Sequence, residues 1–324
     1  MRIIFLNFFS RQEITGGIKV SYRCVEMLAE AGYDAAVWQP AGKPDFLEST
    51  ARVITEQAIN LNTDDILVFP EALNPAFVEI LRKTVAARKI LFCQNPYNLF
   101  NNPHIPKQTP RELGFSQILC VSGVSKGFLS RIFNYHDIAT MTISVDGKTF
   151  APLRKRLQIA FAPRKLRWHA DLISKVFRTK FPEMRYIPWV PIDGVPEARA
   201  AEIMGESAVY LATGQFESCP LMALEAMSAG CAIVGYHGYG GLEYATPHNG
   251  FWHYNDEIEE VVDDLYRTVK GLQNNDALIA AMVANGRATA AHYNAGNMRK
   301  TLLTFFENLP APQSAQQGAA VPGL

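Results

Sequence analysis

The sequence predicts an α/β protein with two domains, each built around a doubly wound parallel sheet. The length of 324 residues is typical of a two-domain protein. Short apolar runs alternate with longer runs of helical periodicity, which is the pattern of β-α-β units. A polar and basic stretch near residues 146–157 interrupts this alternation, which then begins again. We therefore expect an N-terminal domain over residues 1–148 and a C-terminal domain over residues 149–296.

The N-terminal half contains apolar runs of strand length separated by amphipathic segments. The predicted strands are 2–9, 34–38, 65–69, 89–93 and 117–121. The predicted helices are 18–31, which ends at Gly32, then 75–87, and one that Ser122 caps and that runs to about residue 133. Because strands and helices alternate, the strands are expected to lie parallel in one sheet.

The C-terminal half repeats this pattern and ends in helices. The predicted strands are 158–161, 185–189, 208–212 and 232–235. The predicted helices are 169–177, one that ends at Gly230, 258–272, 277–293 and 297–309. Residues 310–324 are rich in Pro, Ala, Gln and Gly, so we expect a disordered tail there.

The composition argues against several classes of protein. The formal net charge is zero, which gives no sign of nucleic-acid binding. The five cysteines are scattered without a C-x-x-C pair, which indicates a reducing compartment and argues against disulfides or a zinc site. The apolar run at residues 3–9 is too short for a signal peptide, and no run approaches the ~20 apolar residues of a membrane span. We therefore expect a cytoplasmic protein.

Positive charge is concentrated in one part of the chain. Residues 154–185 carry ten Lys or Arg, against only Asp171 and Glu183. A local basic run in a neutral protein suits an anionic small ligand or an anionic surface, and it also suits a solvated helix face. Three of these cations, Arg164, Lys165 and Arg167, directly follow a predicted strand, where ligands of open α/β sheets bind.

The most informative stretch runs from Glu217 to Gly230. Ser218 is a predicted N-cap and Pro220 suits a first helical turn, so Glu217 is expected in the loop and Glu225 about one and a half turns into the helix. Carboxylates accept hydrogen bonds from pairs of hydroxyls, as vicinal diols of a sugar or ribose require. The alternative is an exposed helical glutamate at Glu225 and a helix-dipole partner at Glu217.

Glycines stand at two further strand ends. Gly16 and Gly17 follow the first predicted strand, where backbone N–H groups at a helix N-terminus can approach an anion. Gly240 and Gly241 follow the predicted strand 232–235, where backbone can wrap a phosphate or a sugar. Ordinary tight turns explain either glycine pair equally well when it is taken alone.

The order of these motifs resembles that of the GT-B glycosyltransferases, especially the large retaining family 4 group. That family has a Gly-Gly loop after its first strand and an Arg with a nearby Lys after the first strand of its second domain. Its Glu-x7-Glu phrase is matched closely by residues 217–230, and its later G-G-x-x-E and N-G motifs are matched at residues 240–244 and 249–250. The resemblance covers most of the chain and is most specific over residues 217–250.

The resemblance implies two Rossmann-like doubly wound domains facing a cleft, which is the GT-B fold. The C-terminal domain would hold a nucleoside-diphosphate sugar, a UDP- or GDP-sugar, and the N-terminal domain would hold the acceptor. Helix 297–309 would pack back on the N-terminal domain. The acceptor would be a glycan, a lipid-linked sugar or a small molecule. The reaction would retain the anomeric configuration, with the leaving phosphate as base.

The resemblance also assigns roles to individual residues. Glu217 would bind the hydroxyls of the donor sugar, and Glu225 the ribose diol. Arg164 and Lys165 would neutralise the diphosphate, with Gly17 against the phosphates from the other side. The remaining residues expected to line the donor site are Gly16, Ser218, Leu221, Gly240 and Gly241. The sequence has no D-x-D motif, so neither a metal nor any other cofactor is expected.

The chain departs from the family pattern at three places. Pro163 stands where a Gly usually precedes the Arg, and His169 stands where a Lys is usual, so Lys165 or Arg167 is the candidate second cation. The family's N-domain His is missing, and Gln94, Asn95 and His104 are the candidates to replace it. Two alternatives therefore stay open: a sugar-nucleotide-binding protein with little catalysis, and an epimerase of the same shape.

A cluster of cations lies outside these motifs. Its members are Arg82, Lys83, Arg88 and Lys89. They suit either a solvated helix end or a peripheral contact with the anionic inner face of a membrane that carries a lipid-linked acceptor.

Overall fold

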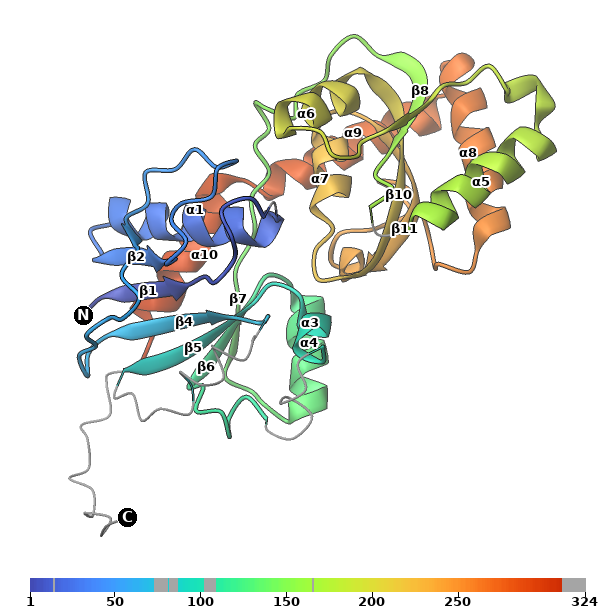
Figure 1. The fold of residues 1–324 in the computed structure, drawn as a ribbon. Helices are drawn as coiled ribbons and strands as arrows, with labels where there is room; N and C mark the ends of the chain where they lie inside the picture. Colours follow the sequence, from blue (N-terminus) through green and yellow to red (C-terminus); the bar gives the residue numbers. More distant parts are fainter. Residues whose placement is uncertain (14, 73–80, 82–86, 102–108, 165, 311–324) are drawn as a thin grey trace. The chain divides into compact units, whose positions relative to one another are not determined.

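The computed structural model describes residues 1–310 except residues 14, 73–80, 82–86, 102–108 and 165 (Figure 1). The predicted tail from residue 311 onward and most of the predicted helix 75–87 lie outside the described residues. The chain forms two compact units. The first comprises Met1–Phe92, Asn102–Ile118 and Thr301–Leu324, and the second comprises Cys93–Asn101 and Leu119–Lys300.

The first sheet has the strand order β3-β2-β1-β4-β5-β6-β7. Its strands are β1 (Ile3–Leu6), β2 (Ala35–Trp38), β3 (Val53–Ile54), β4 (Ile66–Pro70), β5 (Arg88–Cys93), β6 (Gln117–Cys120) and β7 (Ile138–Thr140). The pairs from β3 through β5 are parallel, and β1 lies between β2 and β4. The order reverses between β1 and β4, which is the position where open α/β sheets bind ligands outside their strand ends.

The helices described before the second sheet are α1 (Gly16–Glu30), α3 (Pro96–Leu99) and α4 (Gly123–Phe133). Helix α1 begins where Thr15 Oγ1 accepts a hydrogen bond from the backbone N–H of Ile18. It buries one apolar stripe and is followed by Gly32, whose φ of 89° suits glycine. Ser122 caps α4, as predicted.

The second sheet has the order β12-β11-β10-β8-β9 and is parallel throughout. Its strands are β8 (Arg156–Phe161), β9 (Trp189–Pro191), β10 (Ser207–Glu217), β11 (Ala232–Tyr239) and β12 (Phe251–His253). Because β8 pairs with β9 on one side and β10 on the other, the order reverses between β8 and β10. Ligands are therefore expected outside the carboxyl ends of these two strands.

Helices cover both faces of the second sheet (Figure 1). They are α5 (Arg167–Lys180), α6 (Glu197–Glu206), α7 (Leu221–Ser228), α8 (Ile258–Gln273) and α9 (Ala277–His292). Helix α10 (Ala295–Glu307) follows, and its residues from Thr301 onward belong to the first unit. On one face, Ile173 and Phe177 of α5 and Leu265 of α8 share a buried core with Leu211 and Val234 of the strands. Helices α6, α7 and α9 cover the other face. The predicted α/β class with two parallel sheets is confirmed.

Several predicted element boundaries are wrong. Strands β10 and β11 run to residues 217 and 239, well past the predicted 212 and 235, because Gly214 and Glu217 still pair with His237 and Tyr239. The predicted strand 185–189 is mostly the turn that follows a 3-10 helix, η2 (Pro182–Met184), and pairing begins only at Trp189. The sequence pattern does not predict α3, α6, β3, β7 and β12. All except the Ala-rich α6 are very short.

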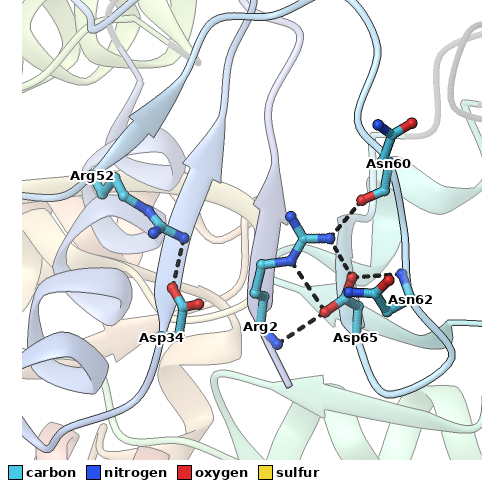
Figure 2. A network of polar contacts seen from close by, with 6 residues as sticks. All are labelled: Arg2, Asp34, Arg52, Asn60, Asn62 and Asp65. Carbon is cyan, nitrogen blue, oxygen red and sulfur yellow. Dashed lines mark hydrogen bonds and ion pairs between the residues drawn. The ribbon is translucent and has the colours of Figure 1, made fainter.

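A buried carboxylate holds the amino ends of β1 and β4 together (Figure 2). Asp65, with only 1% of its side chain exposed, accepts hydrogen bonds from the backbone N–H and the guanidinium of Arg2 and from the backbone N–H of Asn62. Burial alone raises the pKa of this carboxyl, but the hydrogen bonds outweigh burial and hold the pKa below its usual value. A neighbouring pair, Arg52 and Asp34, is half exposed.

We expect Asp65→Asn to lower the free energy of unfolding by about 2–4 kcal/mol at pH 7, because Arg2 would lose its buried partner. A carboxyl whose pKa is depressed by folding stabilises the native state above its unfolded pKa of about 4. That stability is lost as the pH falls through the lower, folded pKa. Urea unfolding should therefore show the difference between variant and wild type shrinking below about pH 4. Asp34→Asn is the control and should cost less than about 1 kcal/mol.

Candidate active site

Glu217 is the last residue of β10 and pairs with Tyr239 at the end of β11. The prediction that it lies in a loop is therefore wrong. The strand bulges between Gly214 and Glu217, and Phe216 within this bulge has a left-handed backbone with φ of 50°. The bulge carries the half-buried Glu217 to the carboxyl end of the sheet, beside the point where the strand order reverses.

Glu225 is the fifth residue of α7, a helix that begins at Leu221 with Pro220 as its N-cap. The prediction that Ser218 is the N-cap is wrong. Its buried hydroxyl hydrogen-bonds to the Ser125 hydroxyl of α4 and does not cap α7. Burial raises the pKa of the Tyr210 phenol, and the nearby charges of Glu217 and Glu225 raise it further. The structure thus brings both predicted carboxylates close to one buried phenol.

Gly240 and Gly241 begin the 3-10 helix η3 (Gly240–Glu243). A Cβ at Gly240 would lie 2.1 Å from the carbonyl oxygen of Ser218 and 2.2 Å from that of Glu217, so only glycine fits there. A Cβ at Gly241 would come no nearer than 3.4 Å, to Cβ of His237. Gly240 therefore fixes the backbone that carries Glu217, whether or not it also contacts a ligand.

Glu243, at the end of η3, lies against the N-terminus of α4. Its Oε2 atom accepts a hydrogen bond of 3.2 Å from the backbone N–H of Val124. The N-terminus of this helix is thereby occupied by a carboxylate of the same unit. The predicted N-G motif is structural too, because the buried Asn249 side chain hydrogen-bonds to Tyr244, Thr246, Trp252 and Thr289.

The three candidates for the family's missing histidine differ in what the structure shows of them. Asn95 caps α3 through its Oδ1, and its Nδ2 donates to the carbonyl oxygen of Phe216 at 3.0 Å. Both ends of this amide are thus engaged within the protein. His104 lies outside the described residues. Gln94 directly precedes Asn95 and remains a candidate.

The candidate cations after β8 also differ in their exposure and in their contacts within the protein. Arg164 is exposed and makes no hydrogen bond or ion pair with any residue that the structure describes. Arg167 is paired with Asp193, and Lys165 lies outside the described residues. His169 is buried, and its Nδ1 lies 3.0 Å from the Tyr236 hydroxyl, while burial lowers its pKa. Within the described part of this loop, Arg164 is thus the cation best placed to meet an anion.

Other members of the basic run have structural roles. Lys155 Nζ donates to three backbone carbonyls, those of Met204, Ser207 and Ala229, at the C-terminal ends of α6 and α7. A cation at a helix C-terminus satisfies its unpaired carbonyls and its dipole. Lys180 pairs with Glu259 and Asp263. The run therefore combines structural cations with the exposed Arg164.

Two helix N-termini of the second unit lie at the same sheet edge as Glu217. Helix α5 follows β8 and α7 follows β10, and neither has a side-chain cap or an acidic residue in its first turn. Uncapped helix N-termini present backbone N–H donors and a partial positive charge, which suit phosphate groups. The carboxyl ends of β8 and β10 thus combine two such N-termini, Arg164 and two carboxylates.

The first unit carries the predicted glycine pair at the start of α1. Gly16 is the first helical residue, and a Cβ built on it would meet no atom of the described residues within 4 Å. The protein itself therefore does not require glycine at this position. Gly17 follows in the first turn, where its carbonyl accepts from Ser21. The open space beside Gly16 would let a ligand approach the backbone closely.

Two of the four cations proposed for a membrane contact make hydrogen bonds within the protein. Arg88 donates to the carbonyl of Pro310, and Lys89 donates to that of Leu81 at 3.0 Å. Arg82 and Lys83 lie outside the described residues. No helix in the described part has the length and apolar character needed to cross a bilayer. Likewise, no group of three or more His, Cys, Asp or Glu residues suited to a metal occurs in the described part.

Comparisons with known proteins agree with this architecture. No family model matches the chain. It is 27% identical over 266 residues to the alpha-1,6-glucosyltransferase of Actinobacillus pleuropneumoniae serotype 7 (strain AP76), and the match covers 79% of this chain and 75% of that protein.

Solved structures give the same fold. HepE of Anabaena in complex with UDP-glucose superposes with a TM-score of 0.69 at 10% identity, over 95% of this chain and 100% of that one. TarM of S. aureus gives a TM-score of 0.57 at 16% identity, and the chain spans 55% of TarM with 76% of its own length.

The order of both sheets and these superpositions define a GT-B fold. These superpositions and the glucosyltransferase relative confirm the prediction of a glycosyltransferase with the GT-B fold.

Proposed function

We propose that this glycosyltransferase transfers glucose from UDP-glucose to a carbohydrate hydroxyl, with retention of anomeric configuration and without a metal ion. The observation that carries the proposal is the grouping of Glu217, Glu225, Arg164 and the N-termini of α5 and α7 at the carboxyl ends of β8 and β10. This set offers acceptors for sugar hydroxyls and positive potential for a diphosphate. Relatives named for glucose transfer or solved with UDP-glucose support the choice of donor.

In the proposed reaction, the bond between C1 of glucose and the β-phosphate oxygen breaks. Charge develops on that oxygen, and Arg164 with the helix N-termini stabilises it. The acceptor hydroxyl oxygen forms the new bond to C1 on the same face, and its proton passes to the leaving diphosphate. Glu217 holds hydroxyls of the donor glucose, and Glu225 holds the ribose diol. UDP leaves as the second product.

The relative's name also suggests the position of transfer. An alpha-1,6-glucosyltransferase forms an α linkage to a 6-hydroxyl, and glucose in UDP-glucose is itself α-linked. An α product from an α donor means retention. We therefore propose the primary 6-hydroxyl of a hexose unit as the acceptor group. A lipid-linked carrier of that hexose stays a prediction.

A donor screen tests this proposal. Purified protein is incubated with UDP-glucose, UDP-galactose, UDP-N-acetylglucosamine or GDP-glucose, with α-1,6-linked glucose oligosaccharides as acceptors, in EDTA or Mg²⁺. We expect UDP and an elongated oligosaccharide only with UDP-glucose, at equal rates in both buffers. Preference for another donor, or loss of the product in EDTA, would overturn the corresponding part of the proposal.

Gly16→Ala tests whether the donor phosphates pack against the start of α1. The variant is expected to be as stable as wild type or slightly more so, because the Cβ meets no protein atom and alanine is the better helix former. The KM for UDP-glucose should rise about tenfold, since the new methyl would occupy ligand space. Thermal unfolding and initial rates measure the two effects. An unchanged KM would show that no ligand approaches Gly16.

A further inference from the structure

A cavity of about 560 Å³ lies beside Tyr239, the residue that pairs with Glu217. Tyr239 ends β11, and the other lining residues, Tyr254, Asn255, Asp256 and Glu257, connect β12 to α8. All belong to the second unit. The cavity thus lies at the carboxyl end of the sheet, on the side of β10 away from β8 and its Arg164 loop. The donor roles proposed above do not use these lining residues.

Aromatic rings border this cavity. Tyr239 stacks on Phe216, with ring centroids 5.5 Å apart and planes within 4° of each other, and Tyr254 lies 6.4 Å from Tyr239. Tyr254 and Phe216 are each 49% exposed, so both rings reach solvent. Exposed aromatic faces suit the apolar C–H faces of pyranose rings, which can stack on them.

The backbone that presents two of these rings is strained. Phe216 has φ of 50° and Tyr239 has φ of 65° with ψ of −55°, a region that bulky residues rarely adopt. The other positive-φ non-glycine residues of the described chain are both asparagines, which tolerate this region. Such strain costs about 1–3 kcal/mol per residue and concentrates at functional sites. Here it turns two neighbouring strand ends so that their rings stack.

Two buried donors near the cavity have no acceptor among the described residues. Nδ1 of His237 accepts a hydrogen bond from the backbone N–H of Tyr239, and burial lowers the pKa of the ring, so the neutral imidazole carries its proton on Nε2. That Nε2 is buried and unpartnered, and the His237 ring lies against Tyr254. Nδ2 of Asn255, a lining residue, is likewise buried and unpartnered. Unpaired buried donors are costly unless a ligand or a water satisfies them.

The charged residues that line the cavity favour a neutral ligand over an anion. Asp256 and Glu257 line it and no lining residue is a cation, so a phosphate or another anion would be repelled. Carboxylates, amides and aromatic rings together are the groups that bind neutral polyhydroxylated molecules. The cavity therefore differs in character from the cationic edge near Arg164.

We propose that this cavity is a further subsite for a neutral carbohydrate acceptor, in which Tyr254 and Tyr239 stack on hexose rings and Asn255 binds a hydroxyl. It would add to the acceptor site that the resemblance places in the N-terminal domain, and it would hold a more distant part of the same oligosaccharide. The inference rests on the proposed function, because a transferase needs its acceptor near the sugar that Glu217 holds. The pairing of Tyr239 with Glu217 places the subsite next to that residue. An oligosaccharide lying in it would explain both the exposed rings and the unpaired donors.

The test compares Tyr254→Ala and Asn255→Ala with the conservative Tyr254→Phe. Tyr186→Ala is the matched control, because it removes an exposed tyrosine that does not line the cavity. Initial rates are measured with α-1,6-linked glucose oligosaccharides of increasing length, and UDP-glucose hydrolysis is measured without acceptor. We expect the acceptor KM of the two alanine variants at the cavity to rise about tenfold, most for the longer oligosaccharides, with hydrolysis unchanged. Tyr254→Phe and the control should match wild type.

An unchanged acceptor KM in Tyr254→Ala, or an equal rise for the donor, would overturn the subsite. Binding of the same oligosaccharides, measured by calorimetry without any donor, separates this outcome from failure of the proposed function. If no sugar nucleotide supports transfer but wild type binds the oligosaccharides and Tyr254→Ala does not, the subsite stands and the proposed function fails. If wild type binds none of them, with or without UDP, the subsite itself is wrong.

Discussion

Glu217→Ala is expected to lower the rate of glucosyl transfer by about 10³-fold. Glu217 ends β10 at the reversal of strand order, and its carboxylate can accept hydrogen bonds from donor hydroxyls that strengthen as positive charge develops on the sugar. A group that binds more tightly in the transition state than in the ground state acts mainly on kcat. Steady-state rates with UDP-glucose should therefore show a large fall in kcat and a small change in donor KM.

Two further variants make this result specific. Glu217→Gln keeps the shape and one acceptor oxygen but loses the charge, so its activity should lie between those of wild type and Glu217→Ala. Glu202→Ala removes a half-exposed glutamate of α6 that pairs with Arg199, and it should leave activity unchanged. Near-normal transfer by Glu217→Ala in a protein with wild-type unfolding would refute the assigned role. Loss of donor binding without loss of kcat would make Glu217 only a binding residue.

Gly240→Ala is expected to damage the protein far more than Gly16→Ala or Gly241→Ala. Its Cβ would meet two backbone carbonyl oxygens, those of Ser218 and Glu217, at 2.1 and 2.2 Å, and backbone cannot swing aside as a flexible side chain can. We expect a loss of at least ~3 kcal/mol in the free energy of unfolding. Because the same movement displaces Glu217, transfer activity should be lost even in molecules that remain folded.

Gly241→Ala is the matched control for this substitution. Its Cβ would approach Cβ of His237 at 3.4 Å, an ordinary contact, so stability should change by less than about 1 kcal/mol. Thermal unfolding followed by circular dichroism measures both variants. Equal stability of Gly240→Ala and wild type would show that the end of β10 can shift freely, and the rigid placement of Glu217 would then be wrong.

The sequence was sufficient for most of the architecture because apolar periodicity reports burial directly. Strands such as β4 and β5 are runs of buried residues, and Thr15 and Ser122 cap their helices through local hydrogen bonds. Such features depend on residues close in the sequence. Edge strands such as β3 and β12 are too short to show a hydrophobic period. Whether such a segment forms a strand depends on its pairing with a neighbouring strand.

The details of the site depend on distant contacts that a sequence pattern does not record. Ser218 has the right identity and spacing for an N-cap, yet its hydroxyl forms a hydrogen bond with the hydroxyl of Ser125 in α4. Gly240 has the pattern of a ligand-binding loop, yet backbone packing alone requires it. The same limit applies to the cations, since only the fold pairs Arg167 with Asp193 and leaves Arg164 exposed.

The product of the wild-type reaction shows directly whether glucose is transferred to a 6-hydroxyl with retention of configuration. Proton NMR is recorded while the protein converts UDP-glucose and an α-1,6-linked glucose oligosaccharide in the presence of EDTA. We expect a new α-anomeric signal, linked to carbon 6 of the terminal glucose, that grows in step with free UDP. A β-anomeric signal, or free glucose and UDP with no new linkage under any donor, would refute the proposed transfer.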